Sequence, residues 1–215
     1  MQKIVVKFAL LLMAAIAAPF SLAQDLAPDV LVKTVTSEVI AIIKQDADIQ
    51  AGNPAKLAEL VETRILPHFN FARMTQSAVA HYWRTASPEQ QLALILEFKT
   101  LLVRTYSTAL SGYRDQVIEY KPLRAEPGAT EVTVRSDVRQ PGRERMTIDY
   151  DMEKTLAGWK VYDIKLAGVS LVTTYRGTFA SKVRDSGIEG LIKSLWDRNR
   201  QNELKTATIE QQSTK

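Results

Sequence analysis

The chain has 215 residues, of which 46% are hydrophobic and 24% are charged, and its formal net charge is +4. This apolar content is too high for a disordered chain, and the length suits one domain with a sizeable core. The sequence contains no cysteine, which excludes disulfides, thiolate nucleophiles, iron–sulfur clusters and attachment of a lipid through cysteine.

The first 23 residues have the features of a secretory signal peptide. Lys3 and Lys7 precede an apolar run of eleven residues, 8–18, that ends at a proline. Ser21 and Ala23 place small side chains at the −3 and −1 positions of a cleavage site. Eleven apolar residues are too few to span a bilayer. We therefore expect cleavage after Ala23 and a periplasmic location; an uncleaved anchor is the alternative.

The rest of the chain is expected to be nearly neutral. The signal segment holds two of the 28 basic residues and none of the 24 acidic ones, which leaves a net charge of +2. Such a small excess argues against nucleic acid as a partner. We expect a single domain over 24–203 and a disordered tail over 204–215, where apolar residues are few.

Helices are predicted in the first half. Apolar residues at helical spacing indicate a helix over 28–50, and a Gly-Asn-Pro sequence at 52–54 ends it and begins a second helix that stops at Pro67. An aromatic-rich segment, 69–86, is predicted as one or two short helices. Residues 87–111 begin with the capping sequence Ser-Pro-Glu-Gln and continue as one long helix.

The second half changes its hydrophobic period. Apolar and polar residues alternate there, which predicts an antiparallel meander of about four strands with one apolar face. Helical spacing returns at Val169 and continues to Arg200, with a break at Gly187. Helices, then strands, then helices indicate the α+β class. The strands are predicted over 117–123, 132–139, 146–152 and 159–166.

Candidate catalytic groups are few. The two histidines lack the spacing of a metal pair. Asp149 and Asp151 lie on one face of a strand, but Arg135 and Arg139 lie across the hairpin, and solvated cross-strand ion pairs are the better interpretation. The sequence has no glycine-rich phosphate loop, nucleophile elbow or Ser-His-Asp order. We therefore expect neither an enzyme nor a bound metal or cofactor.

The apolar residues allow two interpretations. The long helix at 88–111 and the helix after Val169 carry more apolar residues than one core-facing stripe requires. Methionines in the sheet suit irregular or variable apolar contents. An ordinary core is the first interpretation and is favoured by periodicity alone. A cavity for an apolar ligand, walled by the sheet and these two helices, is the second, and spacing cannot separate the two.

Two stretches of the sequence carry longer motifs. The first has Phe-Asn-Phe-Ala-Arg-Met-Thr at 69–75; the second has Ile-Asp-Tyr-Asp-Met at 148–152, Gly-Trp-Lys-Val-Tyr-Asp-Ile at 158–164 and Gly-Val-Ser-Leu-Val at 168–172. Together they resemble the MlaC family, also called the toluene-tolerance family, of periplasmic phospholipid-carrying proteins. The resemblance covers about residues 30–200. Asn70 departs from it, because the family more usually has an aspartate there.

The resemblance implies a helical layer against a small, curved antiparallel sheet, similar to the cone of the nuclear transport factor. It also implies a carrier, expected to be a monomer, with phospholipid as its cargo rather than as a cofactor. Such a carrier shuttles lipid between an outer-membrane lipoprotein–porin complex and an inner-membrane ABC transporter with a lipid-binding ring. Its action maintains the lipid asymmetry of the outer membrane and makes or breaks no bond.

Ten apolar residues are the candidates for lipid binding, and ordinary core packing is the alternative for each. Arg135, Arg145 or Arg176 could meet a phosphate at the mouth of the cavity, although solvated arginines are the more frequent case. An envelope adaptor or chaperone without a lipid is the alternative function, and a periplasmic hydrolase is a third. The ten candidates are Leu102, Tyr106, Met146, Ile148, Tyr150, Val169, Leu171, Val172, Tyr175 and Phe179.

Overall fold

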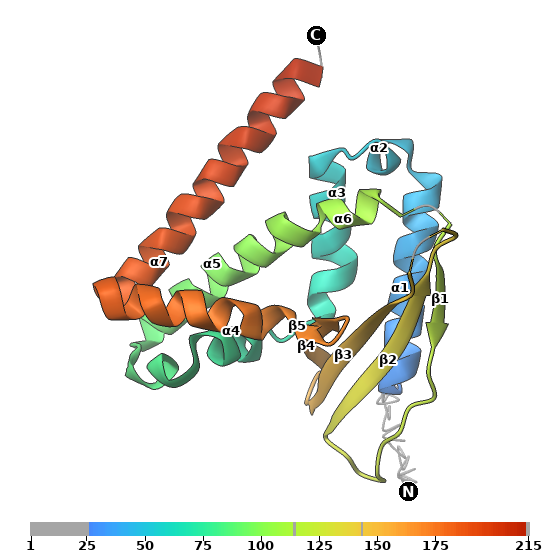
Figure 1. Cartoon of the computed structure of the whole chain (residues 1–215), viewed down its shortest axis with the longest axis horizontal. Coiled ribbons are helices and arrows are strands. Elements are labelled where there is room, and N and C mark those ends of the chain that lie inside the picture. The colour runs from blue at the N-terminus through green and yellow to red at the C-terminus, as the bar shows by residue number, and fades with distance from the viewer. Residues whose placement is uncertain (1–25, 114, 143, 214–215) are drawn as a thin grey trace, which may run out of the picture.

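The computed structural model describes residues 26–113, 115–142 and 144–213 (Figure 1). The predicted signal peptide, residues 1–23, lies outside the described residues. Helices and an antiparallel sheet make up the described chain, which confirms the predicted α+β class. In this part of the chain, no helix is long and apolar enough to cross a membrane.

The first predicted helix is divided into α1 (Pro28–Gln45) and α2 (Ala47–Gln50). Asp46 separates them, because its backbone is extended and its carboxylate accepts hydrogen bonds from the backbone N–H groups of Asp48 and Ile49 at 2.9 and 3.1 Å. A side-chain acceptor of this kind starts a new helix instead of continuing the old one. In the same way, the side chain of Asn53 caps α3 (Pro54–Leu60).

The chain leaves regular helical geometry after α3. A π-helical turn, η1 (Val61–Ile65), is followed by a 3₁₀ turn, η2 (Leu66–His68). Pro67 has no N–H to donate to the carbonyl four residues earlier, so a regular helix cannot pass through it. The aromatic-rich segment then forms α4 (Phe71–Val79) and the 3₁₀ helix η3 (Ala80–Thr85).

Helix α5 (Pro88–Tyr106) begins as predicted, with a complete capping box. The Gln90 N–H donates to Ser87 Oγ at 3.2 Å, and the Ser87 N–H donates to Gln90 Oε1 at 3.0 Å. The helix ends at Tyr106, five residues earlier than the long predicted helix, and α6 (Thr108–Ser111) follows as a separate turn. Leu94, Phe98 and Leu101 are fully buried and define the face of α5 that packs inward.

The described strands form one sheet in the order β1-β2-β3-β4-β5, with every neighbouring pair antiparallel. This is the predicted meander with a short fifth strand added at the edge. The register shifts between Asp151 and Met152 of β3, whose partners on β4 are Asp163 and Val161, so Tyr162 is the extra residue of a bulge in β4. Bulges bend strands and increase their twist. The strands are β1 (Val117–Tyr120), β2 (Glu131–Arg139), β3 (Met146–Thr155), β4 (Gly158–Leu166) and β5 (Val169–Ser170).

The last helix, α7 (Leu171–Ser213), bends sharply at the predicted break. Ser186 and Gly187 have non-helical backbone angles, and Gly187 has a φ of 70° and a ψ of −179°, a conformation open essentially to glycine alone. The helix continues to Ser213. The segment 204–213, which was expected to belong to a disordered tail, is therefore helical in the structure.

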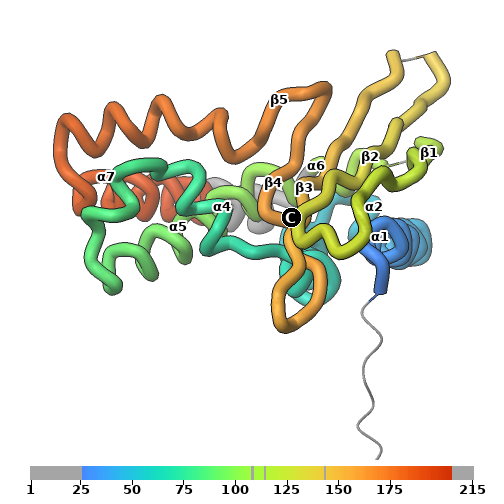
Figure 2. Tube along the Cα trace, turned by 90° about the horizontal axis from the view of Figure 1, so that it is seen from below, coloured from blue at the N-terminus to red at the C-terminus, as the bar shows by residue number. Residues whose placement is uncertain are grey.

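The elements form two parts that lie side by side (Figures 1 and 2). One part is helical and consists of α4, α5 and α7. Its core is centred on Phe98, whose ring meets Tyr175 and Phe179 edge-on at centroid distances of 5.1 and 5.2 Å. The other part contains the sheet, with α1 against one face and α2, α3 and α6 near one end of α1 (Figure 1).

The Arg73 side chain joins α4 to the sheet. Its guanidinium contacts carboxylate oxygens of Glu153 at 2.6 Å and Glu131 at 2.8 Å, and lies 3.6 Å from the ring centroid of Tyr162. Asn70, the cap of α4, donates from Nδ2 to Glu153 at 2.7 Å and accepts from the Arg73 N–H. The amide at position 70 thus makes a contact with Glu153 that an aspartate could not make, because a carboxylate has no N–H to donate.

Candidate functional site

A long cavity lies between helix α1 and the inner face of the sheet. Its volume is about 380 Å³, within the ~300–1,000 Å³ typical of ligand-binding cavities in proteins. The turns η1 and η2 and the helix α6 complete its walls.

Helix α1 supplies the longest wall. Its lining residues follow helical spacing, so that one stripe of the helix faces the cavity. Between Leu31 and Ile43 the helix rises about 18 Å, at 1.5 Å per residue. The cavity is therefore a slot that follows the helix. The residues of α1 that line it are Leu31, Val32, Val35, Thr36, Val39, Ile40 and Ile43.

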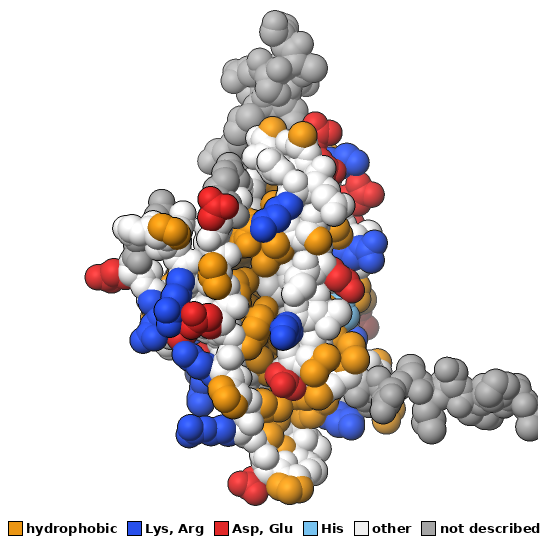
Figure 3. Space-filling view, turned by 90° about the vertical axis from the view of Figure 1, so that its right-hand side faces the viewer, with side chains coloured by type: hydrophobic (Ala, Val, Ile, Leu, Met, Phe, Trp, Pro, Cys, Tyr) orange, Lys and Arg blue, Asp and Glu red, His pale blue; other side chains and the backbone are white. Residues whose placement is uncertain are grey.

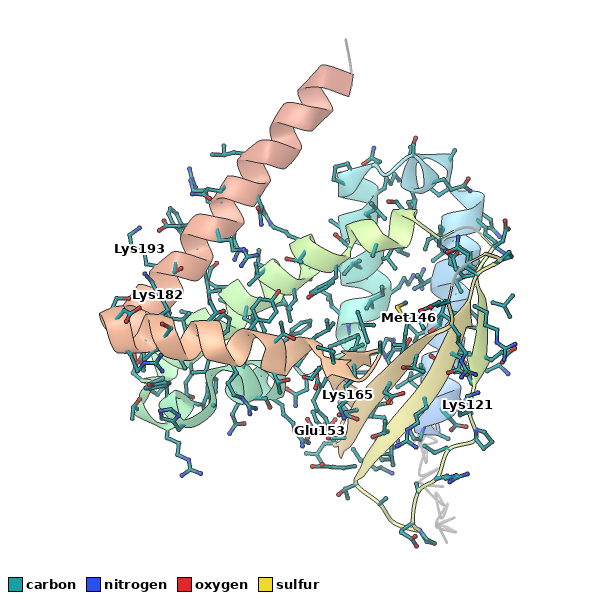
Figure 4. The ribbon with its side chains drawn as sticks, viewed as in Figure 1. Lys121, Met146, Glu153, Lys165, Lys182 and Lys193 are labelled. Atoms are coloured by element: carbon teal, nitrogen blue, oxygen red, sulfur yellow. The ribbon has the colours of Figure 1, made fainter. Side chains whose placement is uncertain are left out.

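The sheet supplies the opposite wall through alternate residues of β3, through single residues of β1 and β2, and through two residues of β4 that flank its bulge. Ile118, Val138 and Met146 are cross-strand partners and form a row across β1, β2 and β3. Figure 4 shows Met146 extending from β3 into the space between the sheet and the helices. Because side chains alternate between the two faces of a strand, one apolar series in each strand is enough to make this wall. Its other members are Ile148, Tyr150, Met152, Val161 and Ile164.

Bulky side chains line both ends of the slot. Leu110 and Tyr113 lie at one end, near the end of α1 where Ile43 lies. Phe69 and Val161 lie at the other end, where their backbones form an isolated bridge between the residue after η2 and β4.

The slot reaches the surface along the boundary between α1 and β1. Figure 3 shows this side of the molecule, with hydrophobic side chains gathered in a groove that runs down the middle of the face. Thr36 and Ile40 from α1 and Ile118 from β1 belong to the lining on this boundary. Lys and Arg side chains gather beside the groove (Figure 3). A molecule in the slot could therefore keep a polar end near water.

Polar groups in the lining are few. Burial raises the pKa of Tyr150 to about 12, although a hydrogen bond with Ser136 acts in the opposite direction. Burial, and then the positive charge of Lys160, lower the pKa of His68, so that this imidazole is uncharged at pH 7. The Tyr113 hydroxyl donates to the carbonyl of Gln116 at 2.9 Å. Thr36 and Gln116 also line the cavity. Most of the remaining lining is hydrocarbon and suits an apolar ligand.

The described residues contain no group of three or more His, Cys, Asp or Glu that could hold a metal ion. The two aspartates considered as catalytic carboxylates lie on the outer face of the sheet, away from the cavity. Asp149 pairs with its cross-strand partner Arg135 at 3.9 Å, as expected, and Asp151 accepts from Lys165 at 2.7 Å. Arg139 pairs instead with Glu119 on β1, at 2.9 Å.

The three arginines considered for a phosphate contact are all engaged elsewhere. Arg135 contacts Asp149 as described above, and Arg145 lies 3.4 Å from Asp137 on the same outer face. The Arg176 guanidinium donates to the carbonyl of Ser77 at 3.0 Å, which links α7 to α4. The structure therefore gives these side chains other partners.

The structure separates the ten candidate lipid-binding residues into two groups. Met146, Ile148 and Tyr150 line the slot. Leu102, Tyr106, Val172, Tyr175 and Phe179 belong instead to the packed core between α4, α5 and α7. Val169 is largely exposed and Leu171 is half-buried where the chain enters α7. The expected wall of two helices, α5 and α7, is thus a packed core in its own right.

Sequence reasoning missed most of the slot. Helix α1 was recognised as amphipathic, but nothing in its spacing indicates whether its apolar stripe meets other side chains or an empty space. The strongest available signal is in the three strands β1, β2 and β3, because Ile118 and Val138 are in register with Met146, and Ile148 lies two residues further along the same face. This shared alternation predicts that the strands have a common apolar face, but it does not predict which helix covers that face.

The fold and the cavity define an α+β protein built around an apolar slot of ligand size. The family model described as MlaC protein matches residues 33–197. The chain belongs to the MlaC family, and the resemblance carried by the sequence motifs is confirmed.

Curated relatives and a solved structure agree with this assignment. The toluene tolerance protein ttg2D of Pseudomonas putida is 25% identical over 161 residues, 74% of each chain. The intermembrane phospholipid transport system binding protein MlaC of Haemophilus influenzae is 22% identical over 174 residues, 80% of this chain and 81% of that one. A phospholipid-binding protein from Ralstonia solanacearum, solved in complex with a phospholipid, is 43% identical with a TM-score of 0.75, and the match covers 80% of this chain and 97% of that one.

Proposed function

We propose that this protein is a periplasmic phospholipid carrier that holds acyl chain in the slot between α1 and the sheet. The observation that carries the proposal is the slot itself, an apolar cavity of about 380 Å³ that opens along one side. Membership of the MlaC family and the phospholipid in the complex of the Ralstonia solanacearum relative support it.

The length of the slot suits an acyl chain. The two leaflets of a bilayer together make a hydrocarbon core ~30 Å thick, so each acyl layer is about 15 Å deep. The stretch of α1 that lines the slot, from Leu31 to Ile43, rises about 18 Å. A chain lying along α1 would therefore be covered over most of its length, while the groove at the α1–β1 boundary leaves room for the headgroup near water.

The energetics also suit a carrier. Each buried methylene contributes about 0.8 kcal/mol, so a sixteen-carbon chain represents on the order of 12 kcal/mol of transfer free energy. A carrier must come close to this value, because otherwise the lipid stays in the membrane. It must not exceed the value greatly, because otherwise the lipid is never delivered. A largely preformed apolar slot meets both requirements without covalent chemistry.

The expected role is transfer between membranes. After removal of residues 1–23, a monomeric domain would receive phospholipid at one membrane complex and deliver it at another. The expected partners are an outer-membrane lipoprotein–porin complex and an inner-membrane ABC transporter with a lipid-binding ring. Such a carrier is not an enzyme, needs no cofactor and helps to maintain the lipid asymmetry of the outer membrane.

Extraction of the purified protein with organic solvent tests the proposal directly. We expect mass spectrometry of the extract to detect phospholipid in a near-stoichiometric amount. Protein that is folded, carries no lipid and takes up none from vesicles of phosphatidylethanolamine and phosphatidylglycerol would overturn it. A lipid-free protein that instead forms a stable complex with another envelope protein would favour the adaptor alternative.

A pair of variants on one strand tests where the lipid lies. Ile148 lines the slot, whereas its neighbour Thr147 is exposed on the outer face of β3. We expect Ile148→Glu to lower lipid loading about tenfold or more, because the carboxylate would have to be buried against hydrocarbon. Thr147→Glu adds the same charge to the same strand and should load normally. Equal loading of the two folded variants would show that the slot is not the site.

A further inference from the structure

The wall of the slot contains one cluster of hydroxyl groups that the apolar lining does not explain. It is formed by Thr36 on α1, Tyr120 on β1, Ser136 on β2 and Tyr150 on β3. Thr36 and Tyr150 line the slot. Tyr120 and Ser136 are cross-strand partners, and Ser136 is paired with Ile148, two residues from Tyr150 along β3. The four side chains thus come from α1 and from the three neighbouring strands β1, β2 and β3.

The Tyr120 hydroxyl is buried and, within the described part of the chain, has no hydrogen-bond partner of acceptable geometry. Burial raises the pKa of Tyr120, and the Thr36 hydroxyl beside it lowers the pKa to a smaller extent, as a group that donates a hydrogen bond to the phenol oxygen would. Such a contact would leave the O–H of Tyr120 itself without an acceptor. The Ser136 hydroxyl, in contrast, donates to the carbonyl of Ile148 at 3.2 Å. The cluster therefore keeps one phenol O–H for which the described residues supply no acceptor.

An unsatisfied buried hydroxyl is costly and uncommon in native proteins. Phenylalanine would fill nearly the same volume without this cost. The presence of the hydroxyl therefore indicates a hydrogen-bond partner that is not part of the protein. The partner must be an acceptor, because a tyrosine hydroxyl donates, and it must lie beside the apolar slot. The carbonyl oxygen of an ester that links an acyl chain to glycerol meets both conditions.

We propose that this hydroxyl cluster is a subsite for the ester linkage of the bound lipid, with Tyr120 as the main hydrogen-bond donor. The inference rests on the proposed function and deepens it, because it names the chemical class of lipid that the slot prefers. The acyl chain fills the apolar slot on one side of the cluster. The glycerol and the headgroup lie on the other side, toward the groove between α1 and β1.

Binding of matched lipids to lipid-free protein tests the subsite. The probes are dipalmitoyl phosphatidylethanolamine, a diester, and its dihexadecyl diether analogue, which lacks the ester carbonyls and keeps the same headgroup and nearly the same chains. We expect the wild-type protein to bind the diester about fivefold more tightly, the value of one ordinary hydrogen bond. Tyr120→Phe should weaken diester binding to the level of the diether and leave diether binding unchanged.

Tyr113→Phe is the matched control, because Tyr113 also lines the slot but already donates to the Gln116 carbonyl. This variant should keep the preference for the diester. The unfolding temperature of the lipid-free Tyr120→Phe variant should not fall, since it loses only an unpartnered hydroxyl.

Equal binding of the two lipids by the wild type, as expected if only water meets the Tyr120 hydroxyl, would overturn the subsite. A preference that persists in Tyr120→Phe would overturn it as well. Both of these results leave the proposed carrier function intact, whereas a failure to bind either lipid would contradict the carrier function itself.

Discussion

At the scale of single residues, similar apolar side chains have different surroundings in the two parts of the molecule. Val172 and Phe179 are buried among the residues of α5 and α7. Ile148, an equally apolar residue, lies beside empty space. A charged substitution at Val172 or Phe179 would therefore measure the stability of the helical core, whereas one at Ile148 reports on the slot.

Tyrosines in the two parts of the molecule make the free energy of unfolding depend on pH. Burial raises the pKa of Tyr150 beside the slot and of Tyr175 in the helical core to about 12 in each case, from an ordinary value of 10.0. Because the folded protein holds these phenols neutral, their contribution is complete below pH 10 and is lost as the pH rises toward 12. We expect urea unfolding to show a stability that declines over this interval.

Single substitutions separate these contributions. Tyr150→Phe and Tyr175→Phe should each make the decline between pH 10 and 12 shallower, because each variant lacks one phenol to ionise on unfolding. Ultraviolet absorbance of phenolate gives an independent readout of the same groups. A decline of unchanged steepness in both variants would contradict the assignment.

At the scale of the elements, α7 shows how a local backbone conformation directs a long helix. Gly187 has a positive φ and extended ψ, and the bend there turns the second half of α7 along α5. Contacts between the two helices include Asn199 Nδ2 to the Glu97 carbonyl at 2.9 Å and Arg104 to the Asn199 carbonyl at 2.8 Å. These contacts depend on the bend.

Two glycines in α7 allow a matched test of the bend. We expect Gly187→Ala to destabilise the protein by about 1–3 kcal/mol, since a Cβ strains this backbone conformation. Gly177 lies in regular helix with nothing within 4 Å of an added Cβ, so Gly177→Ala should be neutral or stabilising by up to ~1 kcal/mol. Urea unfolding of both variants gives the comparison. Equal effects of the two substitutions on the free energy of unfolding would show that the backbone conformation at the bend does not require glycine.

The types and order of the elements could be predicted from the sequence for physical reasons. Helix caps such as Ser87 with Gln90, and the change to a period of two in β2 and β3, act locally and leave clear signals. The division of α1 and α2 was missed, because the capping role of Asp46 competes with an apolar pattern that continues through Ile49. The slot could not be predicted, since the space between α1 and the sheet depends on how these elements pack in three dimensions, and local sequence patterns do not determine that packing.

At the scale of the whole molecule, the Arg73 side chain is a principal polar link between the helical part and the sheet. Its guanidinium meets Glu131 and Glu153 and stacks on Tyr162. Lysine could keep the charge but would lose the two-pronged geometry and the stacking. The link therefore depends on the shape of arginine as well as on its charge.

We expect Arg73→Lys to lower the free energy of unfolding by about 1–2 kcal/mol, because the charged hydrogen bond to Glu153, whose side chain is only 18% exposed, is weakened or lost. Arg139→Lys is the control: Arg139 pairs with Glu119, both side chains are about half exposed, and such surface pairs contribute about 0–1 kcal/mol. Denaturant titration of both variants measures the difference. If Arg139→Lys proved the more damaging change, the role given to Arg73 would be wrong.

The boundary between α1 and β1 has a consequence for the release of cargo. Helix α1 packs against the sheet through side chains such as Leu31 and Val32, and β1 is an edge strand that is paired in the sheet with β2. Moving the helix outward would thus break van der Waals contacts between side chains and leave the hydrogen bonds between the strands intact. An acyl chain could then leave sideways along its full length, without passing Tyr113 or Phe69 at the ends of the slot. The kinetic barrier to unloading would depend on how strongly this one helix is packed against the sheet.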